Sequence, residues 1–228
     1  MNDFIPYGRQ WIDENDIESV VSVLRSDWLT TGPKVDEFEK NFASYVKSKY
    51  AVAVSSGTAA LHAATFAAGI SSGDEVITTP MTFSASSNCI LYQRGTPVFA
   101  DINKETYNIN PQEIEKKITK KTKAIIPVDY TGQPCEIDDI NRIANEHDLV
   151  IIEDASHALG ATYKGKKIGS FADLSVFSFH PVKHITTGEG GMITTDSKEF
   201  YEKLLLFRNH GITKDPKHLI SPDEGDWF

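Results

Sequence analysis

Lysine 183 stands where its side chain could act as a nucleophile. It comes five residues after Ser178, beyond the predicted buried strand DLSVFSF (173–179), and just before the glycine-rich segment TTGEGG (186–191). Burial at the end of a strand would lower the pKa of this lysine, so that its free amine could attack a carbonyl carbon. The alternative is a surface lysine that lays its stem over apolar groups and keeps its ammonium in water.

Two further positions could belong to the same site. The segment Ser55-Ser-Gly-Thr-Ala59 is expected between a strand and a helix, where free N–H groups and the helix dipole suit a phosphate. An ordinary Ser or Thr helix cap would have the same sequence. Asp154 ends the apolar run 149–152, at the edge where open α/β sheets bind ligands, although Asp is also a common N-cap.

These three features together match one cofactor. A phosphate cradle, a carboxylate for a pyridinium nitrogen and an amine for an imine are the three holds on pyridoxal 5′-phosphate (PLP). The sequence therefore predicts a PLP site built from 55–59, Asp154 and Lys183.

Competing motifs are weaker. GATYKGK (160–166) matches most of a nucleotide P-loop, but Lys167 stands where Ser or Thr should bind magnesium, so we expect a hairpin turn at Lys164-Gly165. His180 and His184 have the i, i+4 spacing of a zinc pair, yet Pro181 between them argues against a helix. No metal site is expected.

The charge, the apolar stretches and the cysteine count of the chain exclude several classes of protein. The 228 residues carry 23 Lys+Arg and 32 Asp+Glu, a net charge of −9, which argues against nucleic acid or an anionic membrane as partner. No apolar stretch reaches the ~18 residues that span a bilayer. Two cysteines, Cys89 and Cys135, make no disulfide framework. We expect a soluble, cytoplasmic protein.

The pattern of apolar residues predicts an α/β fold. Two N-terminal helices are expected, the first capped by Asp13 with a core-facing stripe at 17–24, the second opened by Pro33 with core-facing residues at 35, 38, 42 and 45. Strands follow at 51–55, 75–80, 96–102, 123–130, 149–155, 173–179 and 191–195, with helices at 59–70, 111–118, 138–146 and 198–207. This alternation predicts a mostly parallel sheet with helices on both faces.

The chain resembles the DegT/DnrJ/EryC1/StrS family of PLP-dependent sugar aminotransferases. The resemblance runs through TTGP (30–33), SSGTAAL (55–61), TPMTFSASSN (79–88), GTPVFADI (95–102), EDASHALGA (153–161), SFHPVKHITTGEGG (178–191) and RNHGI (208–212). It implies the large domain of a fold-type I PLP-dependent transferase. The expected division is a helical segment at 1–50, the PLP-binding domain at 51–210 and a loop at 211–228 that starts a truncated C-terminal part, the small domain being absent.

The resemblance also assigns roles to residues. Lys183 would form the imine with PLP and Asp154 would pair with the pyridine nitrogen. His157 would contact the ring's 3-hydroxyl, where the family often has glutamine, and Phe83 would stack on the ring. The phosphate would be held by the backbone of Gly57, Thr58 and Ala59 and by the hydroxyl of Ser178.

The branch that the sequence most resembles aminates C4 of a UDP-linked 4-keto-6-deoxy-N-acetylhexosamine on the route to pseudaminic acid. The resemblance implies L-glutamate as donor and a homodimer that shares its active sites. Two alternatives stay open: a catalytically incompetent PLP-binding fragment, and a relative of the sugar 3-dehydratases, which replace the lysine by histidine. His184 directly follows Lys183, but Ser178 and GEGG (188–191) fix the register in favour of transamination.

Overall fold

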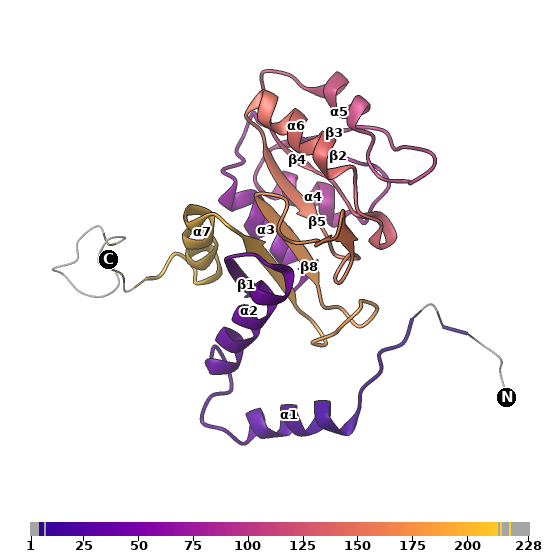
Figure 1. Ribbon diagram of the computed structural model, residues 1–228. Helices are drawn as coiled ribbons and strands as arrows, with labels where there is room; N and C mark the ends of the chain where they lie inside the picture. Colours follow the sequence, from indigo (N-terminus) through magenta and orange to yellow (C-terminus); the bar gives the residue numbers. More distant parts are fainter. Residues whose placement is uncertain (1–4, 7, 214, 216–218, 220–228) are drawn as a thin grey trace.

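A seven-stranded sheet forms the centre of the protein. The computed structural model describes residues 5, 6, 8–213, 215 and 219. The sheet order is β1-β9-β8-β5-β4-β2-β3 (Figure 1). The strands are β1 (Tyr50–Val54), β2 (Glu75–Thr78), β3 (Thr96–Phe99), β4 (Thr122–Ile126), β5 (Val150–Asp154), β8 (Leu174–Ser178) and β9 (Gly191–Thr195). Five of them pair in parallel, and β9 runs antiparallel to both of its neighbours, β8 and β1.

Helices cover both faces of the sheet. On one face lie α3 (Gly57–Ala67), α4 (Ala85–Tyr92) and α7 (Lys198–Arg208). On the other lie α2 (Pro33–Val46), α5 (Pro111–Lys117) and α6 (Ile137–His147). Neighbouring strand residues alternate between the two cores: Val176 packs with α3, whereas Phe177 packs with Phe42 of α2. The predicted α/β class, with a mostly parallel sheet between two helical layers, is confirmed.

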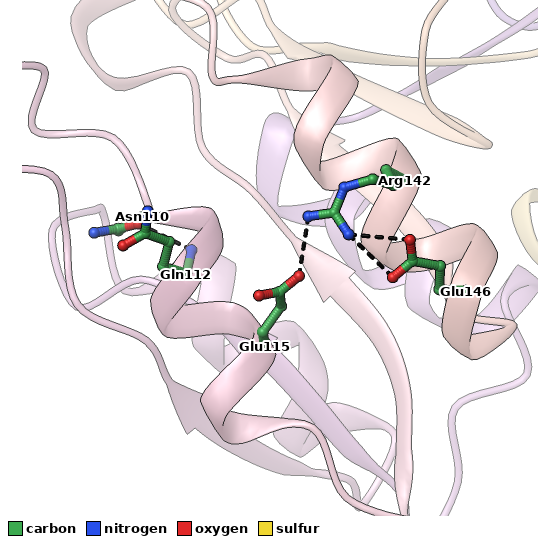
Figure 2. Close-up of polar contacts among 5 residues, drawn as sticks. All are labelled: Asn110, Gln112, Glu115, Arg142 and Glu146. Atoms are coloured by element: carbon green, nitrogen blue, oxygen red, sulfur yellow. Dashed lines mark hydrogen bonds and ion pairs between the residues drawn. The ribbon is translucent and has the colours of Figure 1, made fainter.

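Local signals in the sequence explain where the helices begin. Asp13 caps α1 (Glu14–Leu24) through a capping box with Asp16, and Pro33 occupies the first turn of α2, both as predicted. The Asn110 side chain accepts the N–H of Gln112 at the start of α5 (Figure 2). In the same view Arg142 of α6 pairs with Glu115 of α5 and Glu146 of α6. The Arg142–Glu115 pair joins α5 to α6, although exposed pairs of this kind add little stability.

The apolar stripe of α1 does not face the core, contrary to the prediction. Ile17, Val20 and Leu24 are exposed, and α1 has no buried residue. The ribbon shows α1 lying apart from the sheet, with α2 following it in the chain (Figure 1). In α2 the prediction is correct for Phe42, whereas Tyr45 is 46% exposed. Helical spacing predicts the helix correctly but does not say which surface covers its apolar face.

Outside the main sheet, the structure agrees with the prediction of a hairpin but adds an unpredicted helix. The hairpin expected at Lys164-Gly165 is present as β6 (Thr162–Tyr163) and β7 (Lys166–Lys167), and a short 3-10 turn, η1 (Tyr130–Gly132), follows β4. Helix α4 was not predicted, because residues 85–92 carry polar side chains through their first turn. The loop expected at 211–228 lies outside the described residues except for 211–213, 215 and 219.

Candidate active site

The predicted site residues meet at one edge of the sheet. Strands β1, β8, β5 and β4 run in the same direction, so Ser55, Ser178, Asp154 and Pro127 follow or end them at the same edge. Strand β9 starts there with Gly191, which pairs with Val54 on one side and Ser178 on the other. Ligands of open α/β sheets bind at this edge.

A cavity of about 440 Å³ opens at that edge. Seven of the eight predicted residues line it: Gly57, Thr58, Phe83, Asp154, His157, Ser178 and Lys183. Ala59 does not line it, because its N–H donates to the Ser56 hydroxyl at 3.0 Å as part of the cap of α3. A role for Ala59 in phosphate binding stays a prediction.

A larger hollow of about 1010 Å³ lies elsewhere, between α2, β1 and α7. Of the predicted segment 55–59 it borders Ser55, but neither Asp154 nor Lys183 lines it, and its lining includes Val35, Tyr201 and Leu205. If volume were the only criterion, the candidate site would be this larger hollow and not the cavity that Asp154 and Lys183 line. The smaller cavity is the better candidate because a carboxylate, an amine and a helix N-terminus converge in it.

Two glycines make room for a phosphate cradle at the start of α3. A Cβ on Gly191 would lie 2.4 Å from the carbonyl oxygen of Ser56, and one on Gly57 would lie 2.8 Å from the Cβ of Ser178. Only glycine lets these three segments approach so closely. The first N–H groups of α3 and the Ser178 side chain consequently border one space, which can accept an anion.

Asp154 is 5% exposed at the end of β5. The Ser86 hydroxyl donates to its Oδ2 at 2.7 Å, and the Ser156 N–H donates to its Oδ1 at 3.2 Å. Within the described part of the chain its carboxylate takes part in no ion pair. A buried carboxylate bordering a cavity with only neutral donors suits a cationic ligand group.

Lys183 lies in the loop after β8 and is half-buried at the cavity wall. Desolvation lowers the pKa of its ammonium, and the nearby charge of Asp154 partly opposes that shift. Burial also lowers the pKa of His157, and the positive charge of Lys183 lowers it further. Both groups are therefore biased towards their neutral forms, in which nitrogen lone pairs can accept protons or attack a carbonyl.

The neighbouring side chains His184 and Lys183 lie in different surroundings. His184 is exposed and does not line the cavity, whereas Lys183 does. The register fixed by Ser178 therefore places the lysine, and not the histidine, at the site. Among the described residues, no three His, Cys, Asp or Glu side chains gather as a metal site requires.

Phe83 borders the cavity but is 75% exposed. Its ring can therefore lie over a planar ligand without first leaving a packed core, and its stacking on a cofactor ring stays a prediction. Thr82 and Phe83 precede α4, whose first turn supplies Ser86 to Asp154.

Sequence reasoning missed Asp129 and its neighbours. Asp129 follows β4 and lines the cavity; its Oδ1 accepts the Cys135 N–H at 2.9 Å, and Oδ2 has no hydrogen-bond partner in the described structure. Burial, followed by the charge of Glu153, raises the pKa of its carboxyl well above its usual value. The signal that selected Asp154 was a carboxylate at the carboxyl end of an apolar strand, and Asp129, three residues after β4, has a similar position.

Both cysteines are buried and unpaired. In the described residues no helix has the length and apolar character needed to cross a bilayer.

Known proteins are similar to this chain in sequence and in fold. Residues 10–221 match the DegT/DnrJ/EryC1/StrS aminotransferase family. The spore coat polysaccharide biosynthesis protein SpsC of Bacillus subtilis is 47% identical over 227 residues, which is 100% of this chain and 58% of SpsC. PseC of Helicobacter pylori, an aminotransferase involved in the biosynthesis of pseudoaminic acid, superposes with a TM-score of 0.88 at 39% identity, covering 92% of this chain and 57% of PseC.

A further solved structure contains the cofactor in question. Spr1654 of Streptococcus pneumoniae in its PLP form superposes with a TM-score of 0.88 at 37% identity, covering 93% of this chain and 59% of Spr1654. The chain spans 58% of the length of the curated relatives that it matches. The family match covers all seven strands of the sheet and every residue of the cavity named above. The chain belongs to the DegT/DnrJ/EryC1/StrS aminotransferase family.

Proposed function

We propose that a protein with this sequence is a PLP-dependent aminotransferase that aminates a nucleotide-linked keto-sugar. The observation that carries the proposal is that Lys183, Asp154 and the glycine-lined start of α3 border a single cavity. Residues 51–210 supply all three, so we assign them as the PLP-binding unit and 1–50 as an N-terminal helical segment.

The described side chains fit PLP at each of its functional groups. The N-terminus of α3, with Gly57, Thr58 and the Ser178 hydroxyl, would hold the phosphate. Asp154 would face the ring nitrogen and keep it protonated, because a buried carboxylate stabilises a cation beside it. His157 would contact the 3-hydroxyl and Phe83 would lie on the ring.

When bound, PLP supplies an aldehyde for an amine and a ring that takes up electrons from the carbon beside that amine. Lys183 would first bind the cofactor covalently and then, once freed, move a proton as general base and general acid. Its lowered pKa favours the free amine that both roles require. Asp154 supplies the fixed negative charge that favours electron flow into the ring, and such preorganised electrostatics is usually the largest catalytic term.

For the substrate we propose C4 of a UDP-4-keto-6-deoxy-N-acetylhexosamine, with L-glutamate as amino donor, in a pseudaminic acid or surface polysaccharide route. The likeness to PseC and SpsC supports this assignment. A cytoplasmic homodimer with shared active sites is part of the same proposal. The exposed stripe of α1 and the exposed Phe83 beside the cavity leave apolar surface that a second subunit could cover.

The test is the first half of the reaction. Protein incubated with PLP and then freed of excess cofactor should convert L-glutamate to about one equivalent of 2-oxoglutarate, and the UDP-keto-sugar should restore turnover. Lys183→Ala should abolish this conversion, whereas Lys120→Ala, at an exposed lysine away from the cavity, should leave it unchanged. Equal conversion by Lys183→Ala and the unmodified protein would contradict the assigned role.

A further inference from the structure

A chain of hydroxyl groups leads from the segment before α4 to Asp154. Ser86, in the first turn of α4, is completely buried, and its Oγ lies 2.7 Å from Asp154 Oδ2. The Thr82 Oγ1 lies 2.8 Å from the same Ser86 Oγ. Ser86 and Asp154 are 68 positions apart in the sequence, so this contact exists only because α4 packs at the carboxyl edge of the sheet.

The direction of these hydrogen bonds follows from the donor inventory. An ionised carboxylate can only accept, so the single hydrogen of Ser86 points to Asp154. The longer approach of Ser86 Oγ to the Phe83 carbonyl oxygen, 3.3 Å, is the weaker competitor for that hydrogen. With its hydrogen committed, Ser86 can only accept from Thr82, which gives the order Thr82 to Ser86 to Asp154.

Asp154 depends on Ser86 more than on its other donor. Its second contact, from the Ser156 N–H, is 3.2 Å long, whereas the Ser86 contact has the short distance typical of a hydroxyl donating to a charged oxygen. The Ser86 hydroxyl therefore fixes the rotation of the carboxyl group.

We propose that Ser86 is a positioning residue for Asp154, held in turn by Thr82, and that it sets how firmly the site keeps a bound pyridine nitrogen protonated. This inference rests on the proposed PLP function. Its physical content is that a carboxyl group deprived of its shortest donor can rotate away from the ring nitrogen, so the nitrogen loses its proton more readily. A purely structural Ser86 would tie α4 to β5 and have no such effect.

The experiment reads the protonation of the ring nitrogen directly. Protein loaded with PLP carrying ¹⁵N in the ring is titrated between pH 5 and 10 while the ¹⁵N chemical shift is followed by NMR. In Ser86→Ala we expect the pH midpoint of ring deprotonation to fall by about 1 unit, a tenfold loss of proton affinity. Ser86→Thr, which keeps the hydroxyl, should restore the midpoint.

A matched control lies at the next position. Ser87 is on the same helix, but its hydroxyl donates to the Ser84 carbonyl oxygen, so Ser87→Ala should leave the midpoint unchanged. Should Ser86→Ala fail to fold, Ser86→Cys keeps the size with a weaker donor and should lower the midpoint by a smaller amount.

The outcomes separate this inference from the proposed function. A lower midpoint in Ser86→Ala with rescue by Ser86→Thr supports it. An unchanged midpoint in a folded, PLP-loaded Ser86→Ala or Ser86→Cys overturns the positioning role and leaves the PLP function standing. Failure of the unmodified protein to bind PLP at all overturns the proposed function, and the positioning role with it.

Discussion

Glu153 lies one residue before Asp154 and points to the other face of the sheet, where it is 3% exposed and accepts the Ser175 hydroxyl at 2.6 Å. Burial raises the pKa of its carboxyl from 4.5 to about 7. The folded protein therefore keeps a proton on this group between these two pH values, whereas the unfolded chain has already released it. Stability accordingly falls as the pH rises through that window.

The size of this effect follows from the pKa difference. At 1.36 kcal/mol per unit, a pKa raised from 4.5 to about 7 lowers the free energy of unfolding by roughly 2 to 3 kcal/mol between pH 5 and pH 8. Glu153→Gln keeps the shape and cannot ionise, so it should remove this loss. The charge of Glu153 also raises the pKa of Asp129. Glu153→Gln should therefore also reduce the loss of stability that the raised pKa of Asp129 causes.

Urea unfolding at pH 5 and pH 8 measures the effect. The stability of Glu153→Gln relative to the unmodified protein should be higher at pH 8 than at pH 5 by roughly 2 to 3 kcal/mol. Glu105→Gln, at an exposed glutamate, is the matched control and should show no such difference. An equal relative stability of Glu153→Gln at both pH values would refute the argument that burial holds a proton on this carboxyl.

Two further substitutions test the packing around the site. Gly191→Ala would place a Cβ 2.4 Å from the Ser56 carbonyl oxygen and 2.9 Å from the Gly57 nitrogen, so PLP affinity measured by absorbance titration should fall at least about tenfold, and unchanged affinity would contradict the cradle. Arg208→Met would remove the partner of Glu39, which also accepts the Ala53 N–H. We expect a loss of about 2 kcal/mol in urea unfolding, below the 3–5 kcal/mol for a fully buried pair because the arginine side chain is 27% exposed.

Much of the fold and of the site could be predicted because the signals are local. Strands such as β5 and β8 are short segments rich in Val, Ile, Leu and Phe, and their parallel order places Asp154 and Ser178 at one edge. Seven of the eight predicted site residues line the same cavity. Their individual roles stay predictions, since placement in a cavity does not show what each side chain binds.

What could not be predicted depends on contacts between distant segments. The hydrogen bond from Ser86 to Asp154 forms because α4 packs beside β5. The sequence does not predict α4, since the first turn of this helix is polar. The burial of Asp129 beside Glu153 depends on the side of the sheet on which each of the two side chains lies. The exposure of Ile17 and Leu24 could not be predicted for the same reason, because helical periodicity does not show what packs against the apolar face of a helix.

The most direct test of the account is to find which residue PLP attaches to. Purified protein is incubated with PLP, reduced with borohydride, digested, and analysed by mass spectrometry for the labelled peptide. We expect one stable adduct on Lys183, lost in Lys183→Ala and retained in Lys120→Ala. A label spread over surface lysines, or concentrated on a lysine outside the cavity, would contradict it.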